Sequence, residues 1–121
     1  MTESNLAQIV ETALAALTDR ERRSAAVYID VNPIPAGGAV VIGRKEVTFP
    51  AAGYLAFVDP APTANWGHAC RYLFVESDTH RIHEVPAQFP PFLRGVPPTL
   101  RLIHKGADVP EAVLPTTTRL D

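Results

Sequence analysis

The sequence has little of several features that define common classes of protein. It contains one cysteine, Cys70, so an internal disulfide is excluded. No apolar run approaches the ~20 residues that a helix needs to span a bilayer, so we expect no membrane partner. Residues 1–17 have no basic residue ahead of their apolar ones, which argues against a secretory signal. These features together predict a cytoplasmic protein.

Positive charge is also scarce. The formal net charge is −2, and a chain with that balance has no electrostatic footprint for nucleic acid. The only basic cluster, Arg20 to Arg23, is interleaved with Asp19 and Glu21. We interpret this segment as the solvated end of a helix, where arginines complement the helix dipole, and we expect no nucleic-acid partner.

Motifs that mark common cofactor sites are missing as well. Neither Gly37-Gly38 nor the run 43–45 belongs to a glycine-rich phosphate loop that opens a helix. The acidic residues lack the spacing of a calcium loop, and no Gly-x-Ser-x-Gly nucleophile motif occurs. We therefore expect no cofactor.

What the sequence does contain is the composition of one folded domain spanning residues 1–121, with 46% hydrophobic and 20% charged residues. Its N-terminal part predicts an amphipathic helix over about 4–23. We expect the domain's own core to cover the apolar stripe of this helix; the alternative is docking into a partner's groove. The stripe consists of Leu6, Ile9, Val10, Ala13, Leu14 and Leu17.

After the helix, short apolar runs alternate with Pro- and Gly-rich connections, a pattern typical of strands. The β-rich region covers about 25–104, and residues 107–121 form a predicted loose tail. This pattern favours an α+β fold that is mostly antiparallel β, sandwich-like or with a strongly curved sheet, and has one helix packed on it. The predicted strands cover about 25–31, 39–42, 46–49, 54–58, 69–75, 81–85 and 99–104.

Residues 66–91 hold the only Trp, the only Cys and three of the four His residues. We interpret the segment as a hairpin whose first strand is apolar on both faces, so that strand is expected to be central. A four-residue loop, Ser77 to His80, would pair Phe74 with His83 and suit a positive φ at His80. A two-residue loop would instead bring His83 close to Cys70.

His68, Cys70 and His83 are the candidates for metal or thiol chemistry, because imidazole and thiolate are the usual zinc ligands and can form a nucleophile pair. With the four-residue loop, His83 lies about 13 Å along the strand from the level of Cys70, too far to share a metal. We expect His68 and Cys70 two residues apart on one strand and on the same face, with their Cβ atoms ~7 Å apart. Burial would also raise the thiol pKa. The sequence thus favours a non-enzymatic protein, and a Cys/His metal protein or thiol-dependent enzyme is the competing hypothesis.

Twelve prolines are about twice the ordinary usage, and several fall in the run 87–98, AQFPPFLRGVPP. Such a run is stiff, so its aromatic residues either plug the edge of the core or form a preformed binding strip. We favour a small non-catalytic protein-binding module of the inhibitor, immunity or assembly-subunit type. Its partner would be another protein or a second copy of the chain. The candidate binding residues are Trp66, Phe89, Pro90, Pro91 and Phe92.

Overall fold

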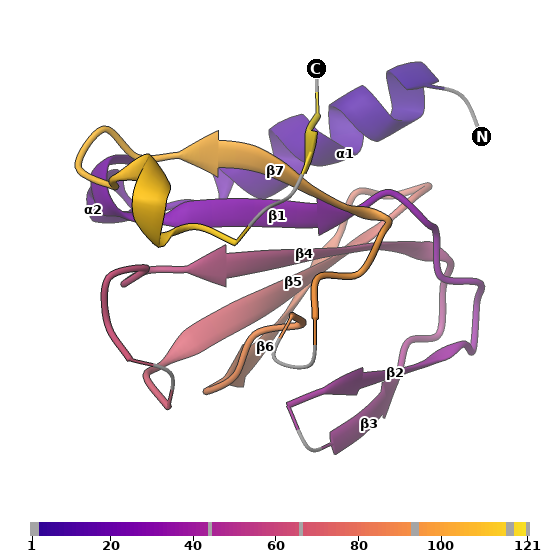
Figure 1. Ribbon diagram of the computed structural model, residues 1–121. Helices are drawn as coiled ribbons and strands as arrows, with labels where there is room; N and C mark the ends of the chain where they lie inside the picture. The colour runs from indigo at the N-terminus through magenta and orange to yellow at the C-terminus, as the bar shows by residue number, and fades with distance from the viewer. Residues whose placement is uncertain (1–2, 44, 66, 93–94, 116–117, 121) are drawn as a thin grey trace.

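The fold is an antiparallel sheet covered by helices on one face and by a hairpin and loops on the other (Figure 1). The computed structural model describes residues 3–43, 45–65, 67–92, 95–115 and 118–120. Its elements are α1 (Glu3–Ala15), α2 (Asp19–Ser24), β1 (Ala26–Asp30), β2 (Ala39–Ile42), β3 (Lys45–Thr48), β4 (Gly53–Asp59), β5 (Cys70–Glu76), β6 (Ile82–Ala87), β7 (Leu100–Lys105), a 3-10 turn (Glu111–Val113) and β8 (Thr118–Arg119).

The main sheet has the strand order β6-β5-β4-β1-β7-β8, and β2 and β3 form a separate hairpin. All pairs in the main sheet are antiparallel except β7 with β8. These observations confirm the predicted α+β class with a mostly antiparallel sheet. The seven predicted strands all occur, displaced by a residue or two at their ends; β8 was not predicted.

The prediction of a single helix over about 4–23 is wrong. The chain forms two helices there, with a break at residues 16–18. Thr18 caps α2: the Glu21 N–H donates to its Oγ1 at 3.1 Å, and the Glu21 side chain accepts from the Thr18 N–H at 2.8 Å. This reciprocal capping box starts a new helix where the apolar period alone would continue the old one. The break lets α1 lie against β5 and α2 against β7.

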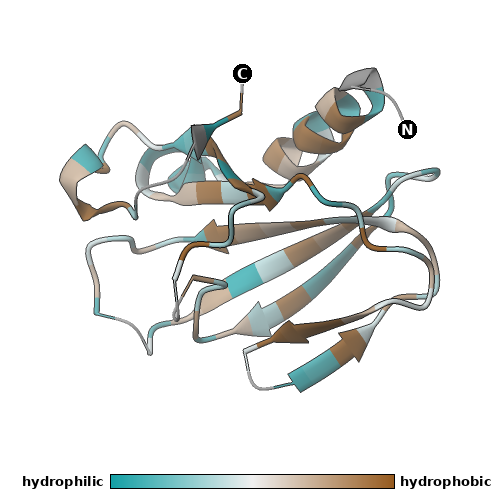
Figure 2. Cartoon of the chain, turned by 45° about the vertical axis from the view of Figure 1, so that its right-hand side comes forward, coloured by the Kyte–Doolittle hydropathy of each residue, from teal (hydrophilic) through white to brown (hydrophobic). Residues whose placement is uncertain are grey.

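The helix-covered face of the sheet holds an aliphatic core. The apolar stripe of α1 packs there, as predicted, and Figure 2 shows the hydrophobic and hydrophilic bands that alternate along this helix. The interior between α1 and the sheet is occupied by side chains that are almost completely buried. They include Ile9, Ala13, Leu17, Val27, Ile29, Val58, Leu73 and Val75.

The opposite face holds an aromatic core. Phe57 sits between Tyr28 and Tyr72, with ring centroids 6.1 and 5.0 Å away. Phe49, which follows β3, stacks on Phe74 with centroids 4.0 Å apart. The cover on this side consists of the β2–β3 hairpin and loop segments rather than a helix.

The segment predicted as a loose tail makes several contacts with the body of the protein. Val109 is buried, and the Leu120 N–H donates to the Leu102 carbonyl of β7 at 3.0 Å. Gly106 ties the start of the segment to α2: a Cβ on it would lie 2.2 Å from the Arg23 carbonyl oxygen. Only glycine fits so close a backbone approach.

Within the residues that the structure describes, no helix combines the length and the apolar composition that a bilayer span requires.

Candidate functional site

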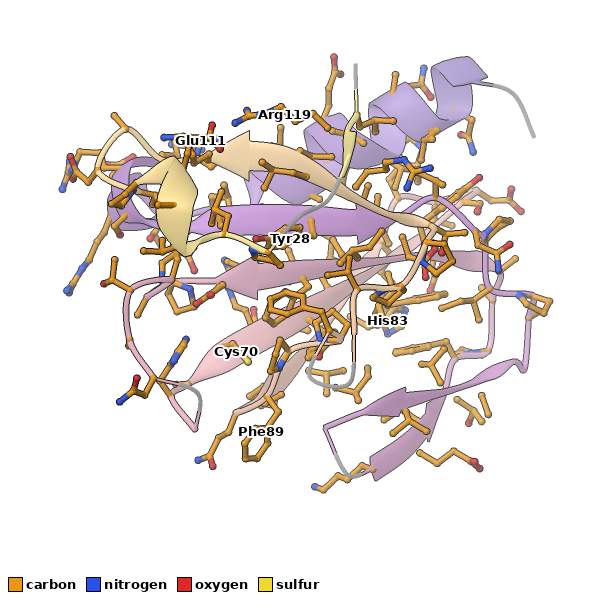
Figure 3. The ribbon with its side chains drawn as sticks, in the orientation of Figure 1. Tyr28, Cys70, His83, Phe89, Glu111 and Arg119 are labelled. Atoms are coloured by element: carbon orange, nitrogen blue, oxygen red, sulfur yellow. The ribbon has the colours of Figure 1, made fainter. Side chains whose placement is uncertain are left out.

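The hairpin formed by β5 and β6 has the register that the four-residue loop predicts. Phe74 pairs with His83 and Cys70 with Ala87, and the Glu76 N–H donates to the Arg81 carbonyl at 2.9 Å. His80 adopts a φ of 60°, the left-handed conformation predicted at the end of the turn. The register places His83 and Cys70 toward opposite ends of β5, as Figure 3 shows.

His83 forms a carboxylate pair at the turn end of the hairpin. Its Nε2 lies 2.6 Å from Oε2 of Glu76, and its ring lies beside those of Phe49 and Phe74. Hydrogen bonds from His83 and then from Thr79 hold the pKa of the Glu76 carboxyl below its usual value. The arrangement anchors the turn and leaves His83 remote from the thiol.

His68 forms a second carboxylate pair, at the other end of the hairpin. It lies in the loop before β5, so the prediction that it shares a strand with Cys70 is wrong. Its Nε2 is 2.8 Å from Oδ1 of Asp59, and its Nδ1 is 2.9 Å from the Asn65 carbonyl oxygen. Burial lowers the pKa of His68, but the bonds to Asn65 and Asp59 and the charge of Asp59 outweigh it and raise that pKa.

Cys70 is a buried thiol beside the aromatic core. Burial, with a further contribution from the negative charge of Asp59, raises its pKa to about 11. Its Sγ lies 3.7 Å from the Phe89 carbonyl oxygen, to which it donates. A thiol in this state has little thiolate at neutral pH, and thiolate is the form that attacks substrates and binds metals.

The three candidate ligands therefore do not converge. His68 and His83 each face a different carboxylate, and Cys70 faces a backbone carbonyl. Among the described residues, no three His, Cys, Asp or Glu side chains lie where they could hold a metal ion together.

The proline-aromatic segment is fastened to the sheet through one carbonyl. The Phe89 oxygen accepts from the Tyr72 hydroxyl at 2.8 Å as well as from Cys70. Pro90, the next residue, is buried, whereas Phe89 itself is half-buried. Figure 3 shows the Phe89 side chain at the lower margin of the molecule, beyond the end of the β5–β6 hairpin. The anchored backbone thus holds this ring at the surface.

Phe92 lies differently from Phe89. Its ring contacts those of Tyr28 and Phe57, with centroids 5.6 and 5.8 Å away and edge-to-face geometry. Phe92 therefore covers the aromatic core, the first of the two roles that the sequence suggested for this segment. Trp66, the remaining aromatic candidate, lies outside the described residues.

One polar cluster was missed by sequence reasoning. Arg71, on β5, is 18% exposed and donates to Glu21 of α2 at 2.7 Å and to Glu84 of β6 at 2.9 Å. It also donates to the carbonyl of Ala16, the residue that follows α1, at 3.1 Å. Burial lowers the pKa of Arg71, but its bonds to Glu21 and Glu84 outweigh that effect and raise it. The only sequence signal was a charged residue on a strand whose two faces are otherwise apolar.

Asp59 was missed too, although a local signal was available. Its Oδ1 accepts from the Ala61 N–H at 3.1 Å as well as from His68. An Asp followed by Pro60 is typical of such a turn. Nothing in the sequence indicated that His68, nine residues later, would return to the same oxygen.

The chain was compared with family models, curated proteins and solved structures, and none of these comparisons gave a match.

Proposed function

We propose that the protein is a small cytoplasmic, non-catalytic protein-binding module that recognises its partner through the surface around Phe89. The observation behind this proposal is that the Phe89 carbonyl accepts two hydrogen bonds, one from Tyr72 and one from Cys70. A segment whose backbone is already immobilised loses less backbone freedom on binding, which lowers the cost of association. Aromatic anchors of this kind often dominate the energy of protein interfaces.

Two features of the reactive residues support a non-enzymatic role. The pKa of Cys70 is raised to about 11, whereas an activated thiol has a lowered pKa. Both ring nitrogens of His68 are engaged, by Asp59 and by Asn65, so His68 has no nitrogen left to act as base for the thiol. His68 and Asp59 therefore serve to fix the loop rather than to act as a catalytic base for the thiol.

The proposal assigns different roles to the two phenylalanines. Phe89 contributes to the binding surface, and Phe92 packs on Tyr28 and Phe57 in the aromatic core. Pro90 and Pro91 lie between them, where their rings restrict the φ angles of a bent segment. The inhibitor, immunity and assembly-subunit roles all use a surface of this kind.

The test compares affinity capture from lysate of the source organism by the parent chain and by Phe89→Ala, with quantification by mass spectrometry. We expect one or a few proteins to be enriched by the parent and lost with Phe89→Ala. Val113→Ala is the matched control, because Val113 is an exposed apolar residue elsewhere in the chain. Equal recovery by all three chains would exclude the Phe89 surface.

A second measurement separates a binding module from a thiol enzyme. Native protein is labelled with a thiol reagent at pH values from 6 to 10, in the presence and absence of denaturant. We expect slow labelling of Cys70 in the folded protein and rapid labelling once it unfolds. Fast labelling of the native protein near pH 7 would favour the enzyme hypothesis.

A further inference from the structure

A series of hydrogen bonds in the connection between β4 and β5 begins and ends at Asp59. Oδ1 of Asp59 accepts from the Ala61 N–H at 3.1 Å, and the Ala64 N–H donates to the Ala61 carbonyl at 3.0 Å. His68 completes the series by contacting the Asn65 carbonyl at 2.9 Å and Oδ1 of Asp59 at 2.8 Å. One imidazole thus contacts both Asp59, at the end of β4, and Asn65, in the connection that follows.

The Asn65 and Asp59 oxygens that the imidazole contacts are both acceptors. A backbone carbonyl has no proton to donate, and the Asp59 carboxylate accepts at the oxygen that already receives the Ala61 N–H. Each ring nitrogen of His68 must therefore carry a proton, so the ring in this arrangement is an imidazolium cation. A neutral ring has one N–H and would turn a lone pair toward one of the two oxygens.

We propose that the Asp59–His68 pair is a pH-sensitive clasp, which fastens His68 to Asp59 and to Asn65 while the His68 ring is doubly protonated and releases one of these two attachments when that ring becomes neutral. This inference rests on the geometry of the loop and does not depend on the proposed function.

The surroundings of the clasp favour the charged ring. Asp59 supplies the facing negative charge from β4, and its side chain is 6% exposed, against 15% for His68. Tyr28 on β1 and Cys70 on β5 are the neighbouring titratable groups, and the charge of Asp59 adds to the effect of burial in raising the pKa of each. Both stay neutral near pH 7. Lys105 on β7 is turned to the carbonyls of Gly106 and Val109.

The direction of the response follows from the raised pKa of His68. The clasp is fully closed below the ring's usual pKa of 6.5 and loosens as the pH rises through the higher value of the folded protein. Cys70 follows His68 by two residues and donates to the Phe89 carbonyl. The clasp is therefore close in sequence to a residue that fastens the Phe89 backbone.

The experiment follows the His68 ring of the full chain by NMR between pH 5 and 9, and measures protection factors of the Ala61 and Ala64 amides over the same range. We expect a doubly protonated ring at pH 6 that titrates above 6.5. We also expect protection of the two amides to fall on the order of tenfold as the ring loses its proton. A ring that is already neutral at pH 6 would overturn the proposal.

Variants test the assignment. His68→Gln should remove the pH dependence of the two protection factors, and His83→Gln should leave it unchanged, because His83 pairs with Glu76 instead. The same pH dependence in His68→Gln as in the parent would overturn the proposal. Should His68→Gln fail to fold, the titration of the parent ring and amides still decides between the outcomes.

Discussion

The two faces of the sheet are both buried, but they are covered by different elements and lined by different kinds of side chain. The face under α1 is lined by aliphatic side chains such as Val27, Val58 and Leu73, and the opposite face is lined by aromatic rings such as Tyr28 and Phe57. The helix satisfies its own backbone hydrogen bonds and needs only a smooth apolar surface beneath it. The hairpin and loops on the other face leave backbone groups that need partners.

The aromatic face supplies those partners. The Tyr72 hydroxyl and the Cys70 thiol both donate to the Phe89 carbonyl, so a mostly apolar layer also fastens the loop above it. Tyr is suited to this position because its ring is apolar and its hydroxyl can bond at the far end. The loop-covered face therefore needs both burial and hydrogen bonds, whereas the helix-covered face needs mainly burial.

The largest effect should come from breaking the aromatic face at its centre. Phe57→Ala removes the ring that contacts Tyr28, Tyr72 and Phe92, and should lower the free energy of unfolding by ~3–5 kcal/mol. Val58→Ala, the next residue on the opposite face, should cost about 2 kcal/mol because it loses two methyl groups. Urea denaturation of both variants measures the difference. A larger loss for Val58→Ala would contradict this account.

Arg71 is a polar contact between the helix-covered face and the helices, and its removal should have the next largest effect. Arg71→Met keeps an apolar stem but leaves Glu21 and the Ala16 carbonyl without their cation. Because the Arg71–Glu21 ion pair is partly exposed, we expect a loss of about 2 kcal/mol in the free energy of unfolding, less than for a fully buried ion pair.

The exposed Arg20→Met is the matched control for Arg71→Met and should change stability by less than about 0.5 kcal/mol. A double-mutant cycle with Glu21→Gln isolates the pair from the rest of the cluster. Additive effects of the two substitutions would show that Arg71 and Glu21 do not interact energetically.

On the loop-covered face, Tyr72→Phe tests the hydrogen bond alone. The substitution keeps the ring and removes the donor to the Phe89 carbonyl, so we expect a loss of ~1 kcal/mol. Amide hydrogen exchange should speed up in residues 87–92 and stay unchanged in α1. An equal change in both regions would indicate that the hydroxyl stabilises the whole domain rather than the loop.

The smallest and most specific effect concerns the pH dependence of stability. The pKa of Glu76 is lowered in the folded protein, so its contribution is present above the usual value of 4.5 and is lost as the pH falls through the folded value. Urea midpoints between pH 7 and 3 should therefore fall less steeply for Glu76→Gln than for the parent. Identical slopes would show that the His83 and Thr79 contacts do not favour the carboxylate.

Local patterns were sufficient for much of the hairpin. The four-residue loop, the positive φ at His80 and the pairing of Phe74 with His83 all follow from turn chemistry and from the two-residue period of a strand. The same patterns failed at residues 16–18, where the apolar helical period continues but the Thr18 capping box starts a second helix. A continuous stripe does not reveal a break when the cap signal lies inside it.

The candidate site was less predictable than the hairpin. The divergence of Cys70 and His83 could be derived from register, but the partners of each polar group could not. Asp59 with His68, and Arg71 with Glu21, join residues from different elements. Phe89 and Phe92 belong to one short proline-rich segment, and only the packing distinguishes their roles.

The sequence by itself determined most of the elements: the α+β class, the strands β1 to β7, and the apolar face that α1 presents. These depend on side-chain period and turn residues, which act over a few neighbouring positions. Only the tertiary structure decided which face of the sheet α1 covers and which carbonyl Tyr72 bonds. It also decided that His68 closes a loop on Asp59. Those outcomes depend on contacts between residues from different segments of the chain, where no local pattern fixes the partner.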